Sequence, residues 1–310
     1  MNKLSTAHNV DRHEHVGIAI AARIGVTISF AVMAACVKLA SHGGANAPEI
    51  LFYRQLGSLP LIFAWVLMGP GLASVRSNRP RAHIIRAVIG VVCMAVMFLA
   101  IEMLPLAEWT ALSFASPLFA TILAVVLLRE HVGFHRWTAI IVGFLGVIVM
   151  TRSNAMMAVP PLGVAVGLLG AFLGAVVVIT VRQLGGTEPP TRIVFWFAVQ
   201  ATAVTAIAMP WYAQSHDAVT WALLVGVGLF GGLVQILMAL SLHYAPVGTT
   251  APFDYLQLIW AALLGWLIWS ELPDARTIGG AVLIAAAGLY TFHREHVHRR
   301  GIAATGGPLG

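Results

Sequence analysis

Residues 104–151 read LPLAEWTALSFASPLFATILAVVLLREHVGFHRWTAIIVGFLGVIVMT, and residues 245–291 read APVGTTAPFDYLQLIWAALLGWLIWSELPDARTIGGAVLIAAAGLYT. Each stretch holds two apolar runs long enough for a helix to cross a membrane, which takes about 20 residues. At an offset of 141 residues, a proline, a small residue and a glutamate coincide: Pro105 with Pro246, Ala107 with Gly248 and Glu130 with Glu271. The chain therefore contains an internal repeat of two predicted membrane-spanning helices.

The composition of the whole chain points to a membrane protein. Of its 310 residues, 59% are hydrophobic and only 10% are charged, whereas soluble domains carry about 25% charged residues. The net charge of +6 does not indicate a nucleic-acid partner, because the basic residues lie singly or in short clusters between apolar runs. The expected surroundings are a lipid bilayer, and no cofactor or metal site is expected.

Apolar runs of spanning length recur along the chain, separated by Gly, Pro and charged residues. They lie near 17–40, 48–68, 83–102, 107–128, 134–151, 161–182, 192–212, 219–242, 247–270 and 275–292. These runs predict an all-α integral membrane protein with ten transmembrane helices.

Basic residues between the runs predict the orientation, since cytoplasmic loops are enriched in Lys and Arg. If the N-terminus is cytoplasmic, Arg152 and Arg276 fall outside, and most others fall inside. The inside set is Lys3, Arg12, Arg76, Arg79, Arg81, Arg86, Arg129, Arg136, Arg182, Arg192, Arg294, Arg299 and Arg300. We therefore expect a multi-pass protein of the plasma membrane, the inner membrane of a bacterium, with both termini cytoplasmic.

The repeat divides the chain into two halves of five spans. The expected segments are a cytoplasmic tail (1–16), a first repeat (17–151), a periplasmic linker (152–160), a second repeat (161–292) and a cytoplasmic tail (293–310). Because five is odd, the second half enters the membrane with the opposite orientation. Inverted repeats are a common plan of secondary transporters, in which two similar halves rock about a central site.

These residues resemble the EamA-type branch of the drug/metabolite transporter superfamily. Three features carry the resemblance: spans four and nine begin after a proline-containing turn and end at a Glu; a Gly-containing span follows each; and span two holds an arginine in FYRQL. The residues are Glu130 and Glu271, then Gly143, Gly146, Gly279, Gly280 and Gly288, and Arg54. One departure is that Pro117 of the first copy aligns with Leu258, while Pro252 lies earlier in the second, so the two copies need not bend alike.

The resemblance covers about residues 17–292 and implies ten helices in two inverted repeats. The substrate cavity would lie between spans one to four and six to nine, with spans five and ten at the periphery. Such proteins move amphipathic metabolites such as amino acids, nucleoside-like compounds, vitamins or drugs. The resemblance does not decide the substrate, the direction of transport, the coupling ion, or whether the protein is a monomer or a homodimer.

Charged residues inside a membrane are functional candidates, because burying a charge costs several kcal/mol. Arg54 lies roughly 9 Å from the outer end of its helix and Asp254 roughly 10 Å from the inner end, at ~1.5 Å per residue. In a ~30 Å core about 11 Å of depth separates them, too far for a direct pair. Arg23 lies about 9 Å from the inner end of span one, so an Arg23–Asp254 pair is predicted as a cytoplasmic-side latch or proton-sensitive site. The alternative is that Arg23 reaches the headgroups and Asp254 faces a wet cavity alone.

The other two intramembrane cations are Lys38 and Arg54. Lys38 lies within a turn of its helix end, which favours a side chain that reaches outward to the headgroups. Arg54 lies deeper and is expected to line the cavity. The alternative is a structural bond from Arg54 to a carbonyl or to an outer-side acid such as Glu49, Glu102 or Glu108.

Polar and aromatic residues of the spans complete the candidate site. Gln257 follows Asp254 by three residues, so both lie on one helix face, and Ser113 and Ser116 hold the equivalent places in span four. Amide groups within spans seven and eight can bind substrate or a neighbouring helix. Aromatic rings can stack on a flat substrate or pack in the core. The remaining candidates are Gln200, Gln235, Trp109, Trp196, Trp260 and Tyr255.

The leading functional hypothesis is a secondary carrier of small molecules with alternating access. The sequence has no phosphate-binding loop, which argues against ATP hydrolysis by this chain. Proton coupling through Asp254, exchange and facilitated diffusion stay open. The alternatives are a membrane-embedded enzyme acting on a lipid or other apolar substrate, for which the intramembrane catalytic groups are too few, and a receptor or assembly factor.

Overall fold

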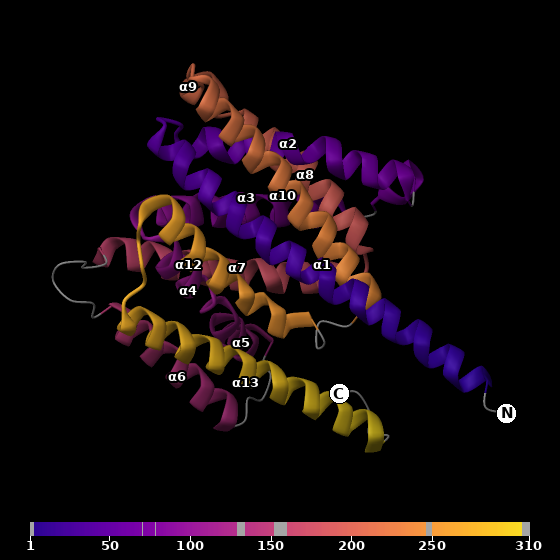
Figure 1. Cartoon of the computed structure of the whole chain (residues 1–310). Helices are drawn as coiled ribbons and strands as arrows, with labels where there is room; N and C mark the ends of the chain where they lie inside the picture. Colours follow the sequence, from indigo (N-terminus) through magenta and orange to yellow (C-terminus); the bar gives the residue numbers. More distant parts are fainter. Residues whose placement is uncertain are drawn as a thin grey trace.

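A computed structural model describes the backbone of residues 3–69, 71–77, 79–128, 134–151, 160–245 and 250–305. Within these ranges, the side chains of residues 3–15, 124, 125, 127, 128, 134–136, 139, 150, 151, 251 and 291–305 are not described. The described residues form helices joined by short turns, without a strand (Figure 1). The predicted all-helical fold is confirmed for this part of the chain.

The helices follow the predicted apolar runs. The elements of the first half are α1 (Lys3–His42), α2 (Ala47–Met68), η1 (Leu72–Val75), α3 (Pro80–Met103), α4 (Leu106–Ser113), α5 (Ser116–Leu128) and α6 (Phe134–Thr151). Those of the second half are α7 (Pro161–Gly185), α8 (Pro190–Ala206), α9 (Met209–Tyr212), α10 (Ala218–Tyr244), η2 (Ala251–Tyr255), α12 (Leu256–Trp269) and α13 (Ala275–Thr305). Helix extends into both stretches that were expected as tails.

Local sequence signals set several helix starts. Pro80, Pro161 and Pro190 each open a helix, where the missing N–H of proline costs nothing. The Asn46 side chain accepts a hydrogen bond from the Glu49 N–H, and the Glu49 side chain accepts one from the Asn46 N–H, which makes a capping box at the start of α2.

Six segments are long and apolar enough to cross a membrane by length and composition. They are Val16–His42, Ala47–Met68, Pro80–Met103, Leu106–Leu123, Pro161–Gly185 and Ala218–Tyr244. The protein is therefore a multi-pass membrane protein. Spans five and ten correspond to the shorter apolar helices Ile140–Val149 and Ala275–Tyr290, span seven ends as two helices, and span nine begins as a 3-10 segment. The count of ten spans stays a prediction.

Two predicted spans are interrupted at equivalent positions of the repeat. Span four breaks between α4 and α5, at Phe114 and Ala115. Span nine changes from η2 to α12 between Tyr255 and Leu256. Phe114 and Tyr255 are equivalent positions, since 255 minus 114 is the repeat offset of 141. Their rings stack on each other, with centroids 4.7 Å apart.

Helix packing also follows the repeat. α1 packs on α10, as α7 packs on α3, and α2 packs on α10, as α8 packs on α3. Similarly, α1 contacts α12, as α7 contacts α4 and α5. Two further contacts, α2 with α8 and α6 with α13, join equivalent helices of the two halves. The first helix of each half therefore packs mainly on helices of the other half.

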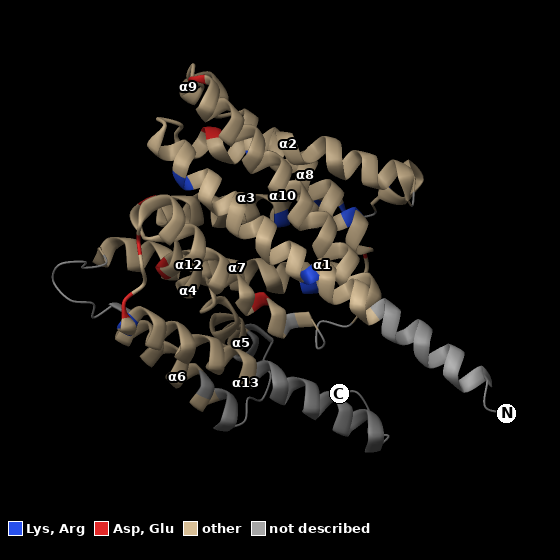
Figure 2. Cartoon of the chain, viewed as in Figure 1, with Lys and Arg blue, Asp and Glu red and all other residues tan. Residues whose placement is uncertain are grey.

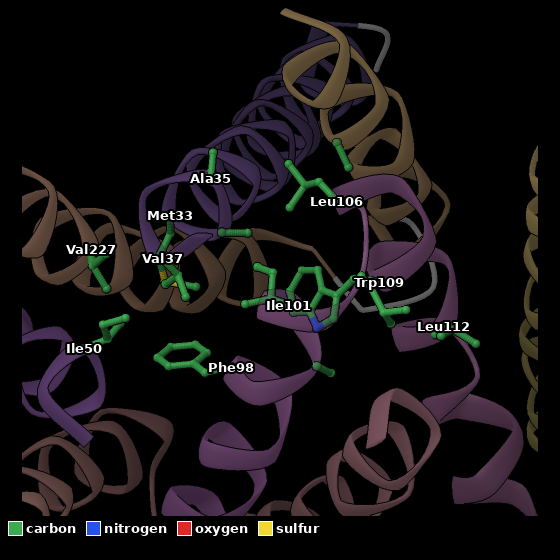
Figure 3. Close-up of a cluster of buried hydrophobic side chains, with 14 of the residues drawn as sticks. Met33, Ala35, Val37, Ile50, Phe98, Ile101, Leu106, Trp109, Leu112 and Val227 are labelled. Atoms are coloured by element: carbon green, nitrogen blue, oxygen red, sulfur yellow. The ribbon is translucent and has the colours of Figure 1, made fainter. Parts of the chain in front are cut away.

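The main hydrophobic cluster lies where α1, α2, α3, α4 and α10 meet (Figure 3). It contains Met33, Ile50, Phe98 and Trp109, all at most 4% exposed. Trp109 stacks on Phe30 with ring centroids 5.8 Å apart. This cluster fixes the helices that carry the charged residues described next.

Candidate functional site: paired and unpaired charges inside the bundle

Most of the described bundle is free of charge (Figure 2), so each charged group within it can be considered in turn. Arg23 of α1 is 6% exposed and faces Asp254 of η2. Its Nε donates to Asp254 Oδ1, and its Nη2 donates to Oδ2 at 2.6 Å. Such a two-point contact matches a guanidinium to a carboxylate in a fixed orientation. The structure thus brings together the two residues predicted to pair, and Asp254 does not stand alone.

A second ion pair lies further along α1. Lys38 is 5% exposed, and its Nζ lies 3.2 Å from Oε2 of Glu271 and 4.7 Å from the ring centre of Trp269. The expectation that Lys38 reaches outward to the headgroups is therefore wrong. The aromatic face and the carboxylate hold the ammonium inside the bundle.

The two ion pairs fasten α1 to span nine at both ends of that span. Arg23 and Lys38 are 15 residues apart, which is about 22 Å along a helix. Between them, the indole N–H of Trp260 donates to the Thr27 hydroxyl at 3.2 Å. α1 of the first half is thus bound along its length to the second half.

Arg54 of α2 contrasts with these pairs. It is 5% exposed, and its Nη1 donates to Oε1 of Gln55 at 2.8 Å, while its Nε has no acceptor. Within the described residues, Glu49, Glu102 and Glu108 do not form an ion pair with it. The bond to an amide leaves its charge uncompensated.

Arg86 of α3 is a second unpaired cation, and sequence reasoning missed it by counting it among the basic residues of the cytoplasmic loops and adjoining helix ends. Its Nε and Nη1 are buried without an acceptor, and its guanidinium lies 4.3 Å from the ring centre of Phe197. Gly90, one turn further along α3, leaves the space that the guanidinium fills, because a Cβ there would lie 2.3 Å from Nη1. The glycine four residues after Arg86 was the signal in the sequence that could have indicated a buried guanidinium.

The other residues predicted for the site either bond to the backbone, pack against a neighbouring helix or are partly buried. Trp109 donates its indole N–H to the Met97 carbonyl at 3.1 Å, and Ser113 donates to the Thr110 carbonyl at 2.7 Å. Ser116 lies against Gly174 of α7. Tyr255, Gln257, Gln235 and Gln200 are partly buried. The Oε1 atom of Gln200 is buried without a donor.

A buried glutamate connects the two halves at the start of α2. Glu49 is fully buried; it accepts from the Gln214 N–H at 2.7 Å, and its carboxylate lies 3.2 Å from His216 Nε2. Asn46 adds a bond to the Tyr212 carbonyl at 2.8 Å. We call this group the Glu49 clamp.

A matching group lies beyond the other end of α2. Glu188, 4% exposed, precedes α8 and accepts from the Ser77 hydroxyl at 2.7 Å and from Arg192 at 2.5 Å. His83 Nε2 lies 3.9 Å from Glu188 Oε1, and Arg192 also donates to the Ser74 carbonyl. We call this group the Glu188 clamp.

The two clamps are related by the repeat. Each joins a glutamate near the start of one half's second helix (α2 or α8) to the other half's connection between its second and third helices. Each also places a buried histidine beside the glutamate. α2 separates the two clamps by its length of 22 residues, which is about 33 Å.

The Glu188 clamp should be stable to mild acid. Burial acts to raise the pKa of Glu188, but the hydrogen bonds from Arg192 and Ser77 outweigh it, so this pKa lies below its ordinary value. A lowered folded-state pKa contributes stability above the unfolded pKa, and this is lost as pH falls through the folded pKa. The melting-temperature advantage of the wild type over Glu188→Gln should be constant from about pH 8 to about pH 5 and shrink below about pH 4. A change between pH 7 and pH 6 would contradict this and implicate the histidine.

Comparison with known proteins agrees with this architecture. Residues 17–152 and 161–292 each match the EamA-like transporter family. The pseudopaline exporter CntI of Pseudomonas aeruginosa is 31% identical over 84% of this chain and 91% of its own length. The chain therefore belongs to the EamA-like transporter family, of the drug/metabolite transporter class, and it is a small-metabolite transporter.

Other relatives are named for different cargoes. An S-adenosylmethionine uptake transporter of Rickettsia bellii is 29% identical over 80% of this chain and 84% of its own length. A riboflavin transporter of Vibrio cholerae is 28% identical over 73% and 76%. A solved crystal structure with 18% identity has a TM-score of 0.57 and covers 86% of this chain and 95% of that one, which shows a shared fold.

Proposed function

We propose that this protein is a secondary carrier that moves a small amphipathic metabolite by alternating access. It would have ten transmembrane helices in two inverted repeats, 17–151 and 161–292, joined by a periplasmic linker at 152–160. The matched packing of the halves supports this plan, as does the position of the first turn of α1 and the last turn of α13 toward one end of the bundle (Figure 1). Both termini would lie in the cytoplasm of a bacterium.

The observation that carries this proposal is the pair of clamps. In the proposed orientation the Glu49 clamp closes the periplasmic side, and the Glu188 clamp closes the cytoplasmic side. Because each clamp binds one half to the other, opening one of them separates the halves on that side alone. Two closures related by an inverted repeat are what alternating access requires.

The charged pairs would act inside this frame. We assign Arg23 and Asp254 as a latch on the cytoplasmic side, with Asp254 as the group through which protons could couple. Substrate would contact Arg54, Ser113, Ser116, Gln235, Tyr255 and Gln257, whereas Trp109 supports the core. The names of the relatives favour a carrier over a membrane-embedded enzyme, and they support a small metabolite as the cargo.

Opening either clamp should expose the centre to one side. With Gln200→Cys as reporter in a background where Cys36 and Cys93 are replaced by Ala, Glu49→Gln should raise labelling by a membrane-impermeant maleimide from the periplasm. Glu188→Gln should raise it from the cytoplasm. Each change loses charge-assisted bonds worth about 2 kcal/mol, which corresponds to a shift of roughly tenfold or more in the open fraction.

The matched control is Asp217→Asn. Asp217 lies in the same connection as Gln214 and His216, but it caps α10 by accepting from the Thr220 N–H at 2.9 Å. It should leave labelling on both sides unchanged. If both clamp variants raise labelling from the same side, or neither does, the clamps are not alternating gates.

A further inference from the structure

The intramembrane cations fall into two classes. Arg23 and Lys38 each have a carboxylate partner, whereas Arg54 and Arg86 have buried guanidinium nitrogens without acceptors. Within the described residues, no carboxylate forms an ion pair with either of these two arginines. An uncompensated buried charge costs several kcal/mol, so its presence calls for a group that neutralises it.

Arg54 and Arg86 lie on helices that contact each other at Gln55 and Met94. α2 and α3 run in opposite directions along one another, and Gln55 of α2 reaches Met94 of α3, with Nε2 to Sδ at 3.8 Å. Gly90 lies between Arg86 and Met94 at four-residue spacing, so all three share one face of α3. Arg54 bonds to Gln55, so its guanidinium is linked through Gln55 to the face of α3 that carries Arg86.

The surroundings of the two guanidiniums are apolar and aromatic. Phe197 lies under Arg86 and belongs to a buried cluster with Ala87 and Ala201 that also contacts Met94. Gln200, one turn beyond Phe197 on α8, has an amide oxygen without a donor. An organic ligand could cover these surfaces and offer an N–H or O–H to Gln200.

We propose that Arg54 and Arg86 bind an oxyanion of the transported metabolite, so that the cargo carries a carboxylate or phosphate on an apolar or aromatic body. Guanidinium groups bind both kinds of oxyanion by paired N–H bonds. In the empty site both guanidiniums have buried N–H groups without an acceptor, and an oxyanion supplies the acceptors. This assignment rests on the carrier function proposed above and adds the chemical class of its cargo.

The first test needs no ligand. Because an unpaired buried cation destabilises the empty protein, Arg54→Gln and Arg86→Gln should each raise the melting temperature of ligand-free protein in detergent, by about 2–4 °C. Arg23→Gln, which breaks an ion pair, is the control and should lower it. If Arg86→Gln and Arg54→Gln lower the melting temperature as Arg23→Gln does, these arginines are structural and the proposal is overturned.

The second test identifies the oxyanion. Hippurate, its uncharged amide and phenyl phosphate are each added to wild-type protein. We expect a saturable rise in melting temperature with hippurate, with phenyl phosphate or with both, which distinguishes carboxylate from phosphate, and none with the amide. Either arginine variant should weaken this binding at least ~10-fold. An equal shift with the amide, or no shift with either anion, overturns the proposal.

Two glycine variants test the geometry without removing charge. Gly90→Ala places a methyl group where Arg86 Nη1 and Phe197 now lie, 2.3 and 2.6 Å from the new Cβ, so it should abolish the anion-induced shift. Gly279→Ala, whose Cβ meets nothing within 4 Å, should keep it. Unchanged anion binding in Gly90→Ala would exclude Arg86 from the site. The side-specific labelling of the clamp variants reports the carrier cycle separately, so failure of the anion tests leaves that result standing.

Discussion

Asp254→Asn is expected to destabilise the protein by about 3 kcal/mol, toward the low end for breaking a buried ion pair because the Asp254 side chain is 28% exposed. Arg23, 6% exposed, would keep its charge inside the bundle with a neutral amide in place of a carboxylate. The melting temperature in detergent should fall by about 8 °C, and transport should be lost. Arg23→Gln should have an effect of similar size, because it leaves the carboxylate unpaired.

Two double variants distinguish the contribution of this ion pair to stability from its role as a latch in transport. Arg23→Gln/Asp254→Asn removes both charges, which costs little stability when a buried pair is replaced as a unit; it should recover most of the melting temperature without recovering transport. The charge-swapped pair Arg23→Asp/Asp254→Arg should recover part of both. If the neutral double variant transports at the wild-type rate, the pair is structural and not a latch. If the swapped double rescues neither property, the two residues do not act as a pair.

The Lys38–Glu271 pair should respond less to loss of its acid. Glu271→Gln also leaves a cation without its acid, but Lys38 keeps the aromatic face of Trp269, and the Glu271 side chain is 29% exposed. The Lys38 stem is long and flexible, so the ammonium can move to the headgroups when its acid is removed. The expected loss of stability is larger for the Arg23–Asp254 pair because Arg23 lies further from its helix end than Lys38 and because its guanidinium is more rigid than an ammonium on a flexible stem.

Depth along a helix could be predicted from sequence, and this is why the Arg23–Asp254 contact was found. The rise of a helix is fixed, so distance from a helix end gives depth once the spans are placed. The repeat offset also makes Phe114 and Tyr255 equivalent positions, but their stacking is visible only in the structure.

The direction in which a side chain points around its helix could not be predicted. Lys38 was expected to reach the headgroups because it lies within a turn of its helix end, and the sequence does not show that span nine ends beside it at Glu271. Arg86 was counted with the basic residues of the cytoplasmic loops and the adjoining helix ends. Its guanidinium instead lies over Gly90, further into the helix. The partner of a side chain depends on which distant helix packs there.

The contacts of the two clamps, which involve the connections between helices, could not be predicted from the sequence either. Glu49 and Glu188 each follow a turn, and nothing in their neighbours along the chain pairs them with His216 and His83. Among the matched positions of the repeat, Glu130, Pro246 and Gly248 lie outside the described residues, as do residues 152–159 of the linker. The segment boundaries and the roles of the site residues stay predictions.

Gly228→Val is expected to prevent stable folding, because α2 and α10 meet backbone to backbone at this residue. A Cβ on Gly228 would lie 2.7 Å from the Cα of Gly57 and 2.8 Å from the carbonyl oxygen of Tyr53. No side chain can rotate away to make room, so the helices must separate. Small residues allow such close approach between membrane helices. The expected cost is about 3 kcal/mol or more, seen as loss of monodisperse protein or a fall of about 8 °C in melting temperature.

Gly226→Ala is the matched control, two residues earlier on the same helix. Its Cβ would meet only the Cys36 sulfur, at 3.5 Å, an ordinary contact, and alanine favours a helix over glycine by up to about 1 kcal/mol. It should therefore be neutral or stabilising. The crossing also positions the proposed anion site, since Arg54 lies one turn from Gly57 and its Cγ packs at Gly231. If Gly228→Val folds as well as Gly226→Ala, α2 and α10 do not cross at this distance, and the placement of Arg54 beside α10 fails with it.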